Sequence, residues 1–169
     1  AVLIIYLLLV AIFNHWGYPL FVLITIPLGL AGGLVGLQAL NYTGSLFAYL
    51  GGQGWHQPFD MITMLGFLIL LGTVVNNPIL IVEQSRKNLQ SGQLGVVDAV
   101  KSAVASRLRP ILMSTATTLF GLLPLVLFPG AGSELYRGVG IVVLAGLIVA
   151  TLLSLTFLPA LLISVLSRT

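Results

Sequence analysis

Residues 72–83 read GTVVNNPILIVE, and they lie inside an apolar run that begins at Met61. Two adjacent carboxamides, Asn76 and Asn77, are followed at once by Pro78. Because unsatisfied amides are costly in lipid, we expect both side chains to face protein or water. Pro78 removes a backbone donor and is expected to bend the helix at the same level. Polar groups beside a kink indicate a functional site within a bundle of membrane helices.

The composition is typical of a membrane protein. The sequence has 169 residues, of which 58% are hydrophobic and 7% are charged, and its mean hydropathy is +1.12. A soluble domain carries about 25% charged residues. The absence of cysteine excludes disulfides, thiol nucleophiles and Cys-based metal sites. The net charge of +3 does not indicate nucleic-acid binding, because the basic residues gather at the expected membrane edges.

Apolar segments alternate with polar turns, which predicts an all-α membrane protein without sheet: five transmembrane helices and one cytoplasmic amphipathic surface helix. Residues 1–169 are expected to form a single membrane domain with spans at about 1–13, 19–40, 61–84, 108–128 and 139–165. Segment 1–13 is shorter than the roughly 20 residues that a span needs, so we interpret it as the end of a truncated helix. Segment 94–106 has Val97, Val100 and Val104 on one face and is expected to lie along the membrane surface.

The second expected helix carries a pattern of small residues. Gly29, Gly32, Gly33 and Gly36 form two overlapping small-xxx-small pairs. Such pairs let another helix approach closely, although glycine is also simply common in membrane helices. We favour close packing at these positions.

The basic residues predict the orientation of the chain in the membrane. Those between the third and fourth spans are Arg86, Lys87, Lys101, Arg107 and Arg109. Arg168 falls on the same side if the spans alternate. The positive-inside rule places this side, and with it the C-terminus, in the cytoplasm.

Two polar clusters are expected to share one level of the membrane. At a rise of about 1.5 Å per residue, Asn76 lies about 10 Å above the cytoplasmic edge, and Ser114 to Thr118 lie about 8–14 Å above it. If the two helices face each other, they form a polar seam of Asn76, Asn77, Ser114, Thr115 and Thr118. The alternative is that the hydroxyls bond carbonyls of their own helix and the amides only join helices. We favour that alternative for the hydroxyls and a functional role for the amides.

Titratable side chains are expected outside the middle of the membrane. The acidic residues in loops, surface segments or at the boundary are Asp60, Glu83, Asp98 and Glu134. Because proton coupling needs a group that titrates, this chain alone is not a complete proton-driven machine. His15 and His56 lie in turns on opposite sides and cannot share a metal. The sequence has no Ser-His-Asp set, phosphate loop or H-E-x-x-H motif, so we expect no enzyme activity, cofactor or metal site.

The motifs GTVVNNPILIVE at 72–83 and RLRPILMST at 107–115 resemble those of the resistance–nodulation–division (RND) efflux pumps, in their AcrB-like hydrophobe/amphiphile branch. The similarity extends to TIPLG at 25–29, GLLPL at 121–125, GAGSE at 130–134 and FLP at 157–159, so it covers essentially the whole chain in order. The five expected spans resemble the last five of the twelve helices of the family.

The resemblance implies a proton-driven exporter of the bacterial inner membrane, a trimer that works with a periplasmic adaptor and an outer-membrane channel. In such pumps the essential aspartates lie on the fourth helix of the first half, and large periplasmic domains bind the substrate; neither is in this sequence. Arg107 matches the family arginine at the base of the eleventh helix, and Ser114 matches its relay hydroxyl. Some members carry a lysine where this sequence has Asn76, and an asparagine cannot form the ion pair of that lysine.

We interpret the chain as the C-terminal transmembrane part of such a pump, with the lipid bilayer and the rest of the pump as its partners. In this hypothesis Asn76, Asn77, Ser114 and Thr118, with Arg107 below them, form the non-titrating wall of a proton site, and Thr115 or Thr118 can substitute for Ser114. One alternative is a non-transporting membrane scaffold or assembly subunit, in which the seam merely orients helices. Another is an RND pump for metal ions or lipids.

The predicted orientation can be tested by cysteine labelling in the full-length protein. A Ser91→Cys variant is expected to react with a membrane-impermeant maleimide only when the cytoplasmic face is accessible, because residue 91 lies among the basic residues. A Gln53→Cys variant, in the opposite loop, serves as the control for labelling from the periplasm. Periplasmic labelling of the Ser91→Cys variant would contradict the orientation.

Overall fold

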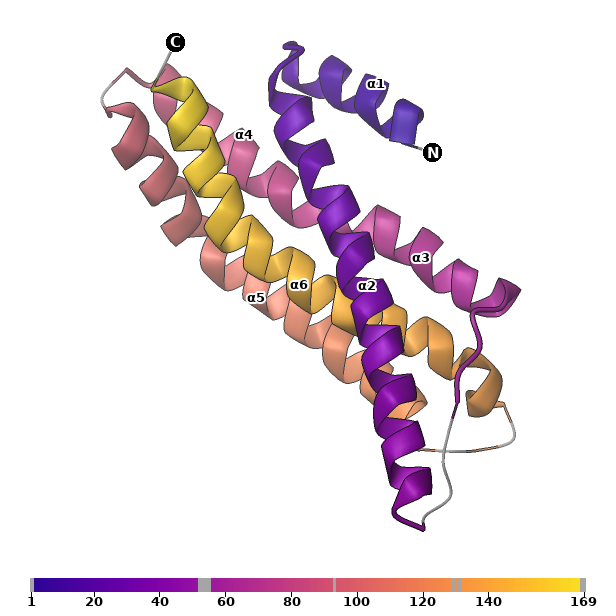
Figure 1. The fold of residues 1–169 in the computed structure, drawn as a ribbon. Coiled ribbons are helices and arrows are strands. Elements are labelled where there is room, and N and C mark those ends of the chain that lie inside the picture. Colours follow the sequence, from indigo (N-terminus) through magenta and orange to yellow (C-terminus); the bar gives the residue numbers. More distant parts are fainter. Residues whose placement is uncertain (1, 52–55, 93, 129, 131, 168–169) are drawn as a thin grey trace.

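The computed structural model describes residues 2–51, 56–92, 94–128, 130 and 132–167, and all of its regular secondary structure is helical (Figure 1). Its helices are α1 (Val2–Phe13), α2 (Tyr18–Tyr49), α3 (Met61–Val74), α4 (Asn76–Gln90), α5 (Val96–Leu127) and α6 (Ser133–Leu166). The prediction of an all-α protein is confirmed. Ala1, the start of the first expected span, and Arg168, which entered the prediction of orientation, lie outside the described residues.

By length and composition, four helical stretches of the described chain could cross a membrane. They are Tyr18–Tyr49, Met61–Gln90, Val96–Leu127 and Glu134–Leu166, while α1 is a shorter apolar helix. The stretch Tyr18–Tyr49 continues well past residue 40, where the sequence had predicted its end. Hydroxyls on this extension bond carbonyls three residues earlier, from Thr43 to Leu40 and from Ser45 to Tyr42, so these polar residues are compatible with a helix.

The stretch Met61–Gln90 begins at a cap and is interrupted in its middle. The Asp60 carboxylate accepts a hydrogen bond from the Thr63 backbone N–H at 2.8 Å, which starts α3 and lowers the pKa of Asp60. Helix α3 ends at Val74 and α4 begins at Asn76. Pro78 has no N–H for the Val74 carbonyl, so one rung of the helical ladder is missing at this break.

Helix α5 is continuous through Pro110, so residues 96–106 are its first turns and not a separate surface helix. Two of the three valines on the apolar face contact protein: Val100 is fully buried in a cluster with Val82 and Leu162, and Val104 packs against that cluster, while Val97 is 40% exposed. The Asn88 side chain donates to the Ala99 carbonyl at 2.9 Å and holds this segment against α4. Amphipathic periodicity shows that one face is apolar, but it does not distinguish a lipid surface from a neighbouring helix.

Helix α6 lies in the middle of the bundle, in contact with α2, α3, α4 and α5 (Figure 1). Its contact with α2 runs along the glycine pattern. A Cβ at Gly32 would lie 2.6 Å from the Val149 Cβ. A Cβ at Gly36 would overlap the Ala145 Cβ. Gly29 and Gly33 also face close neighbours, Val74 and Val142 among them. This face of α2 therefore has no room for a side chain.

One end of the bundle carries the α1–α2 turn, the last turns of α4 and α6 and the first turns of α5 (Figure 1). We call it the basic end. Polar side chains hold its helices together. Arg107 donates to Gln84 at 2.7 Å, and Gln84 donates to Asn88 at 3.1 Å. Lys87 pairs with Glu83 at 2.7 Å. The Arg107–Gln84 bond joins α5 to α4, while the other two contacts lie within the last turns of α4.

The opposite end is tied by the segment that precedes α3. The Asn41 side chain both donates to the Gln57 carbonyl at 3.0 Å and accepts from the Gln57 N–H at 2.7 Å. The Gln57 side chain donates to the Glu134 carbonyl at 3.1 Å. Because Asn41 lies on α2 and Glu134 on α6, this segment connects the ends of two helices.

A Gly33→Leu substitution tests the contact between α2 and α6. A Cβ at Gly33 would lie 3.1 Å from Val142 Cγ1 and 3.2 Å from the Val142 carbonyl oxygen. Overpacking of this kind is expected to destabilise the protein by about 1–3 kcal/mol, measured as a lower melting temperature of the purified full-length protein. Ala31→Leu adds bulk on an exposed face of the same helix and is the matched control. Equal melting temperatures for the two variants would argue against the contact.

Candidate functional site

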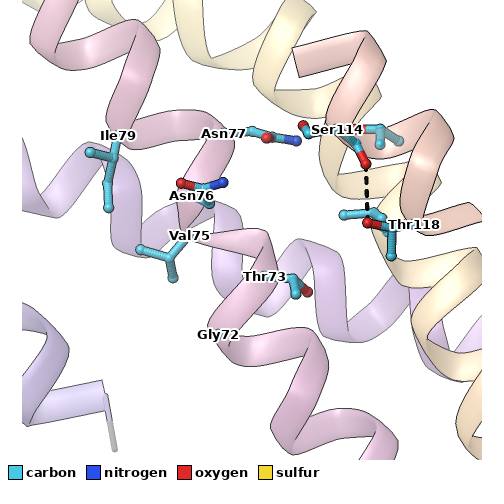
Figure 2. A pocket seen from close by; sticks show the side chains of 10 residues that line it. Gly72, Thr73, Val75, Asn76, Asn77, Ile79, Ser114 and Thr118 are labelled. Carbon is cyan, nitrogen blue, oxygen red and sulfur yellow. Dashed lines mark hydrogen bonds between the residues drawn. The ribbon is translucent and has the colours of Figure 1, made fainter. Parts of the chain in front are cut away.

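A cavity of about 340 Å³ lies at the break between α3 and α4 (Figure 2). Its polar lining comes from two directions: one set from the α3–α4 break and one from the middle of α5. The lining residues are Gly72, Thr73, Val75, Asn76, Asn77, Ile79, Ser114, Thr115, Thr118 and Leu147. The two polar clusters of the sequence therefore surround one cavity.

Asn77 is held in place by a hydrogen-bonded link across three helices. Its side chain is 4% exposed, and its Nδ2 donates to the Thr151 hydroxyl at 3.2 Å. That hydroxyl lies 3.2 Å from the hydroxyl of Thr115, and both threonines are buried. Thr151 therefore connects α4 and α5 through α6. In the apolar interior this link satisfies an amide donor that would otherwise be unpaired.

Asn76 has a different environment from its neighbour. Its side chain is exposed at the wall of the cavity and makes no hydrogen bond to any part of the chain that the structure describes. Figure 2 shows it beside Asn77, whose side chain extends toward Ser114 on α5. One amide is thus held by protein, while the other can bond whatever enters the cavity.

The remaining hydroxyls of the α5 cluster bond carbonyls of their own helix. Thr118 donates to the Ser114 carbonyl at 3.0 Å (Figure 2). Ser114 donates to the Ile111 carbonyl, also at 3.0 Å. Thr117 donates to the Met113 carbonyl at 2.8 Å. Bonds of this kind, from hydroxyls to carbonyls of the same helix, are what the sequence analysis favoured for these residues. Ser114 and Thr118 still line the cavity, but within this cluster it is Thr115 that reaches another helix.

Arg107 does not line the cavity. Its guanidinium donates to the Gln84 carboxamide at 2.7 Å, which places it at the junction of α4 and α5 on the basic end. In the described structure it therefore contributes to the helix contact rather than to the polar lining.

Sequence reasoning missed Thr151. The residue lies in a long apolar run without a motif. The available signal was helical spacing, because Leu147, Thr151 and Ser154 recur at intervals of four and three residues and share one face. All three are buried. Two small polar residues on the buried face of an otherwise hydrophobic membrane helix indicate an interhelical contact.

The lining offers hydrogen bonds but no titrating group. Amides and hydroxyls donate and accept, yet neither changes charge near neutral pH. The volume corresponds to about ten waters at roughly 30 Å³ each. The cavity lies beside α5, the least buried of the four long helical stretches described, in which Leu112, Met113 and Phe120 are 48%, 62% and 72% exposed. A site of this kind can solvate an ionisable group that reaches it from another element.

Comparison with known proteins gives matches along nearly the whole chain. Residues 1–166 match the AcrB/AcrD/AcrF family. The chain is 36% identical over 156 residues to the multidrug export protein AcrF of Escherichia coli strain K12, covering 92% of the chain and 14% of that protein.

Two further relatives are multidrug resistance proteins MdtC. The chain is 33% identical over 159 residues to MdtC of Cronobacter sakazakii and 34% identical over 159 residues to MdtC of Escherichia coli strain UTI89. Each match covers 94% of the chain and 14% of the relative, so the chain spans about one seventh of the length of these proteins. The family match over residues 1–166 confirms the resemblance seen in the two sequence motifs, and the chain belongs to the AcrB/AcrD/AcrF family.

Proposed function

We propose that this chain is the C-terminal transmembrane part of a proton-driven RND efflux transporter for hydrophobic or amphiphilic compounds. In this proposal the protein is a secondary active antiporter, not an enzyme, and the cavity beside Asn77 belongs to its proton-coupling site. Support comes from the family match and from relatives that are named for multidrug export and multidrug resistance.

The proposal rests on the difference between two adjacent amides, one bonded to protein and one facing the cavity. Asn77 is buried and bonded to Thr151, whereas Asn76 is exposed to a cavity that holds no titratable side chain in its lining. An amide that serves only to join helices needs no adjacent cavity. We propose that the titrating groups are aspartates of the first transmembrane half and that they approach this wall.

Such a wall can tune a carboxyl group for proton exchange. Burial in a low-dielectric site favours the protonated form, while hydrogen bonds from amides and hydroxyls favour the ionised form. The two effects compete, so the carboxyl group can gain and lose a proton near neutral pH. Asn76 is placed to donate to the ionised form, and the Thr115 hydroxyl can exchange its bond with Thr151 for one to the carboxylate.

Movement of α4 supplies the coupling step in this proposal. When the carboxyl group changes protonation state, its hydrogen bonds to Asn76 and Asn77 reorganise. Helix α4 bends most easily at Pro78, because the Val74 carbonyl lacks the backbone N–H that would bond it in a regular helix. A change at the cavity can thus alter the angle between α3 and α4.

The proposal extends to assembly and location. We propose a homotrimer in the bacterial inner membrane, with the basic end and the C-terminus in the cytoplasm, working with a periplasmic adaptor and an outer-membrane channel. A scaffold subunit would use the Asn77–Thr151 bond only as a helix contact. An RND pump for metal ions or lipids would share the same wall, and the transport experiments below use multidrug substrates to separate these alternatives.

Replacing the amides tests the wall directly. In the full-length transporter, Asn77→Leu is expected to abolish export of amphiphilic dyes and drugs while expression and trimer formation remain intact. Asn76→Leu is expected to reduce export strongly. Ser114→Ala should have a weaker effect, since Thr115 and Thr118 remain. Efflux is measured by dye release from cells and by drug susceptibility.

The matched control is Thr117→Ala, which removes a hydroxyl with the same kind of intrahelical bond from outside the cavity. If Asn76→Leu, Asn77→Leu and the double variant all exported at wild-type rates, the wall hypothesis would fail and the scaffold interpretation would be preferred.

Thr151 gives a second test, because it does not line the cavity but bonds Asn77 and Thr115, which do. Thr151→Val retains the shape of the side chain but leaves the Asn77 donor and the Thr115 hydroxyl without their shared partner. The expected loss of stability is about 1–3 kcal/mol, together with impaired export. Thr151→Ser keeps the hydroxyl and should retain both properties.

Thr156→Val controls for loss of a threonine hydroxyl on the same helix, since Thr156 bonds only its own helix at Leu152. A Thr151→Val variant with wild-type stability and export would show that the link does not hold Asn77 in its working position.

A further inference from the structure

A second polar cavity, of about 310 Å³, lies at the basic end between the α1–α2 turn and the last turns of α4. Its polar lining consists of Asn14, His15 and Tyr18 from the turn and Arg86 and Gln90 from α4. It shares no lining residue with the cavity at the α3–α4 break.

Arg86 gives this cavity its chemistry. The guanidinium makes no hydrogen bond or ion pair with any residue that the structure describes, although the side chain is half-buried. The neighbouring Lys87, by contrast, is paired with Glu83 at 2.7 Å. No carboxylate is among the residues that line the cavity. An arginine with five donors, none of them bonded to a residue that the structure describes, is suited to bind a phosphate.

The α1–α2 turn adds further donors in a defined position. Asn14 adopts a left-handed conformation with φ of 49°. The Gly17 N–H donates to His15 Nδ1 at 3.0 Å. Because Nδ1 accepts, the imidazole hydrogen is on Nε2, which remains available as a donor. The ring centroids of His15 and Tyr18 are 5.1 Å apart, and those of Tyr18 and Phe13 are 6.3 Å apart. The donors therefore belong to a turn whose shape is held by its own contacts.

The surroundings favour a lipid over a soluble anion. Trp16, two residues from Tyr18, is 70% exposed, and exposed tryptophan and tyrosine are typical of the headgroup level. The same helix pair carries an apolar groove of about 390 Å³, lined by Val2, Leu3, Tyr6, Leu20 and Leu23. A donor-rich cavity and an apolar groove on one helical hairpin match the headgroup and an acyl chain of a single lipid molecule.

We propose that this cavity binds the phosphate of an anionic phospholipid from the cytoplasmic leaflet, with Arg86 as the main ligand and His15 and the Asn14 amide as further donors. Basic pockets between membrane helices on the cytoplasmic side are a known means of holding anionic headgroups. The proposal uses the cytoplasmic placement of the basic end, but it is independent of the transport cycle and of the wall around Asn77.

The test measures lipid binding by the purified full-length protein. Dioleoylphosphatidylglycerol is titrated into delipidated protein in detergent, with dioleoylphosphatidylcholine in parallel, and bound lipid is counted by native mass spectrometry. The wild type is expected to retain phosphatidylglycerol in preference to phosphatidylcholine. Arg86→Gln is expected to bind phosphatidylglycerol about fivefold more weakly, since one basic residue is lost at the membrane surface.

Lys101→Gln is the matched control. It removes the same charge from the same end of the protein, but Lys101 is exposed and lies outside the cavity. This variant is expected to bind the lipid as the wild type does. Size-exclusion chromatography checks that both variants keep the wild-type assembly.

Two outcomes would overturn the proposal. Equal phosphatidylglycerol affinity in wild type and Arg86→Gln would remove Arg86 as the ligand. Full displacement of phosphatidylglycerol by millimolar inorganic phosphate would show that the cavity takes a soluble anion and not a lipid. Both readouts are binding measurements, so they remain interpretable whatever the export activity of the variants.

Discussion

The close contact between α2 and α6 is the constraint on which the rest of the bundle depends. Lipid tails are as apolar as leucine side chains, so membrane helices associate through close packing and not through exclusion of water. Gly32 and Gly36 provide that packing, because a Cβ at either position would overlap α6. With α2 seated against it, α6 occupies the middle of the bundle and touches the helices on every side. The positions of α3, α4 and α5 follow from that central helix.

The central place of α6 also explains the geometry of the polar site. Thr151 can meet Asn77 from α4 and Thr115 from α5 only because α6 runs between them. A buried amide donor is thereby satisfied at the level where Pro78 removes a rung of the helical ladder. The site therefore combines a fixed polar link with a backbone that bends easily. Asn76, one residue earlier, remains exposed to the cavity.

The two ends of the bundle are held by polar contacts, and the cavity lies between them. Arg107 and Gln84 join α4 to α5 at the basic end, while Asn41 and Gln57 hold the opposite end. The α3–α4 break lies between these two tied ends. The cavity borders α5, the least buried of the long helices, so a further membrane element can approach it there.

The sequence by itself determined the helical class, the position of the polar site and the face of α2 that carries glycines. Hydropathy and helical spacing are local properties, and they identify Asn76, Asn77 and Gly33 without any knowledge of neighbours. Tertiary structure decided which faces meet. It selected Thr115 over Ser114 as the interhelical partner and brought in Thr151 from a distant apolar run. It also turned the expected surface helix into the first turns of α5, because its apolar face packs against the bundle. Periodicity shows which residues share a face, but only the packed bundle determines what lies opposite that face.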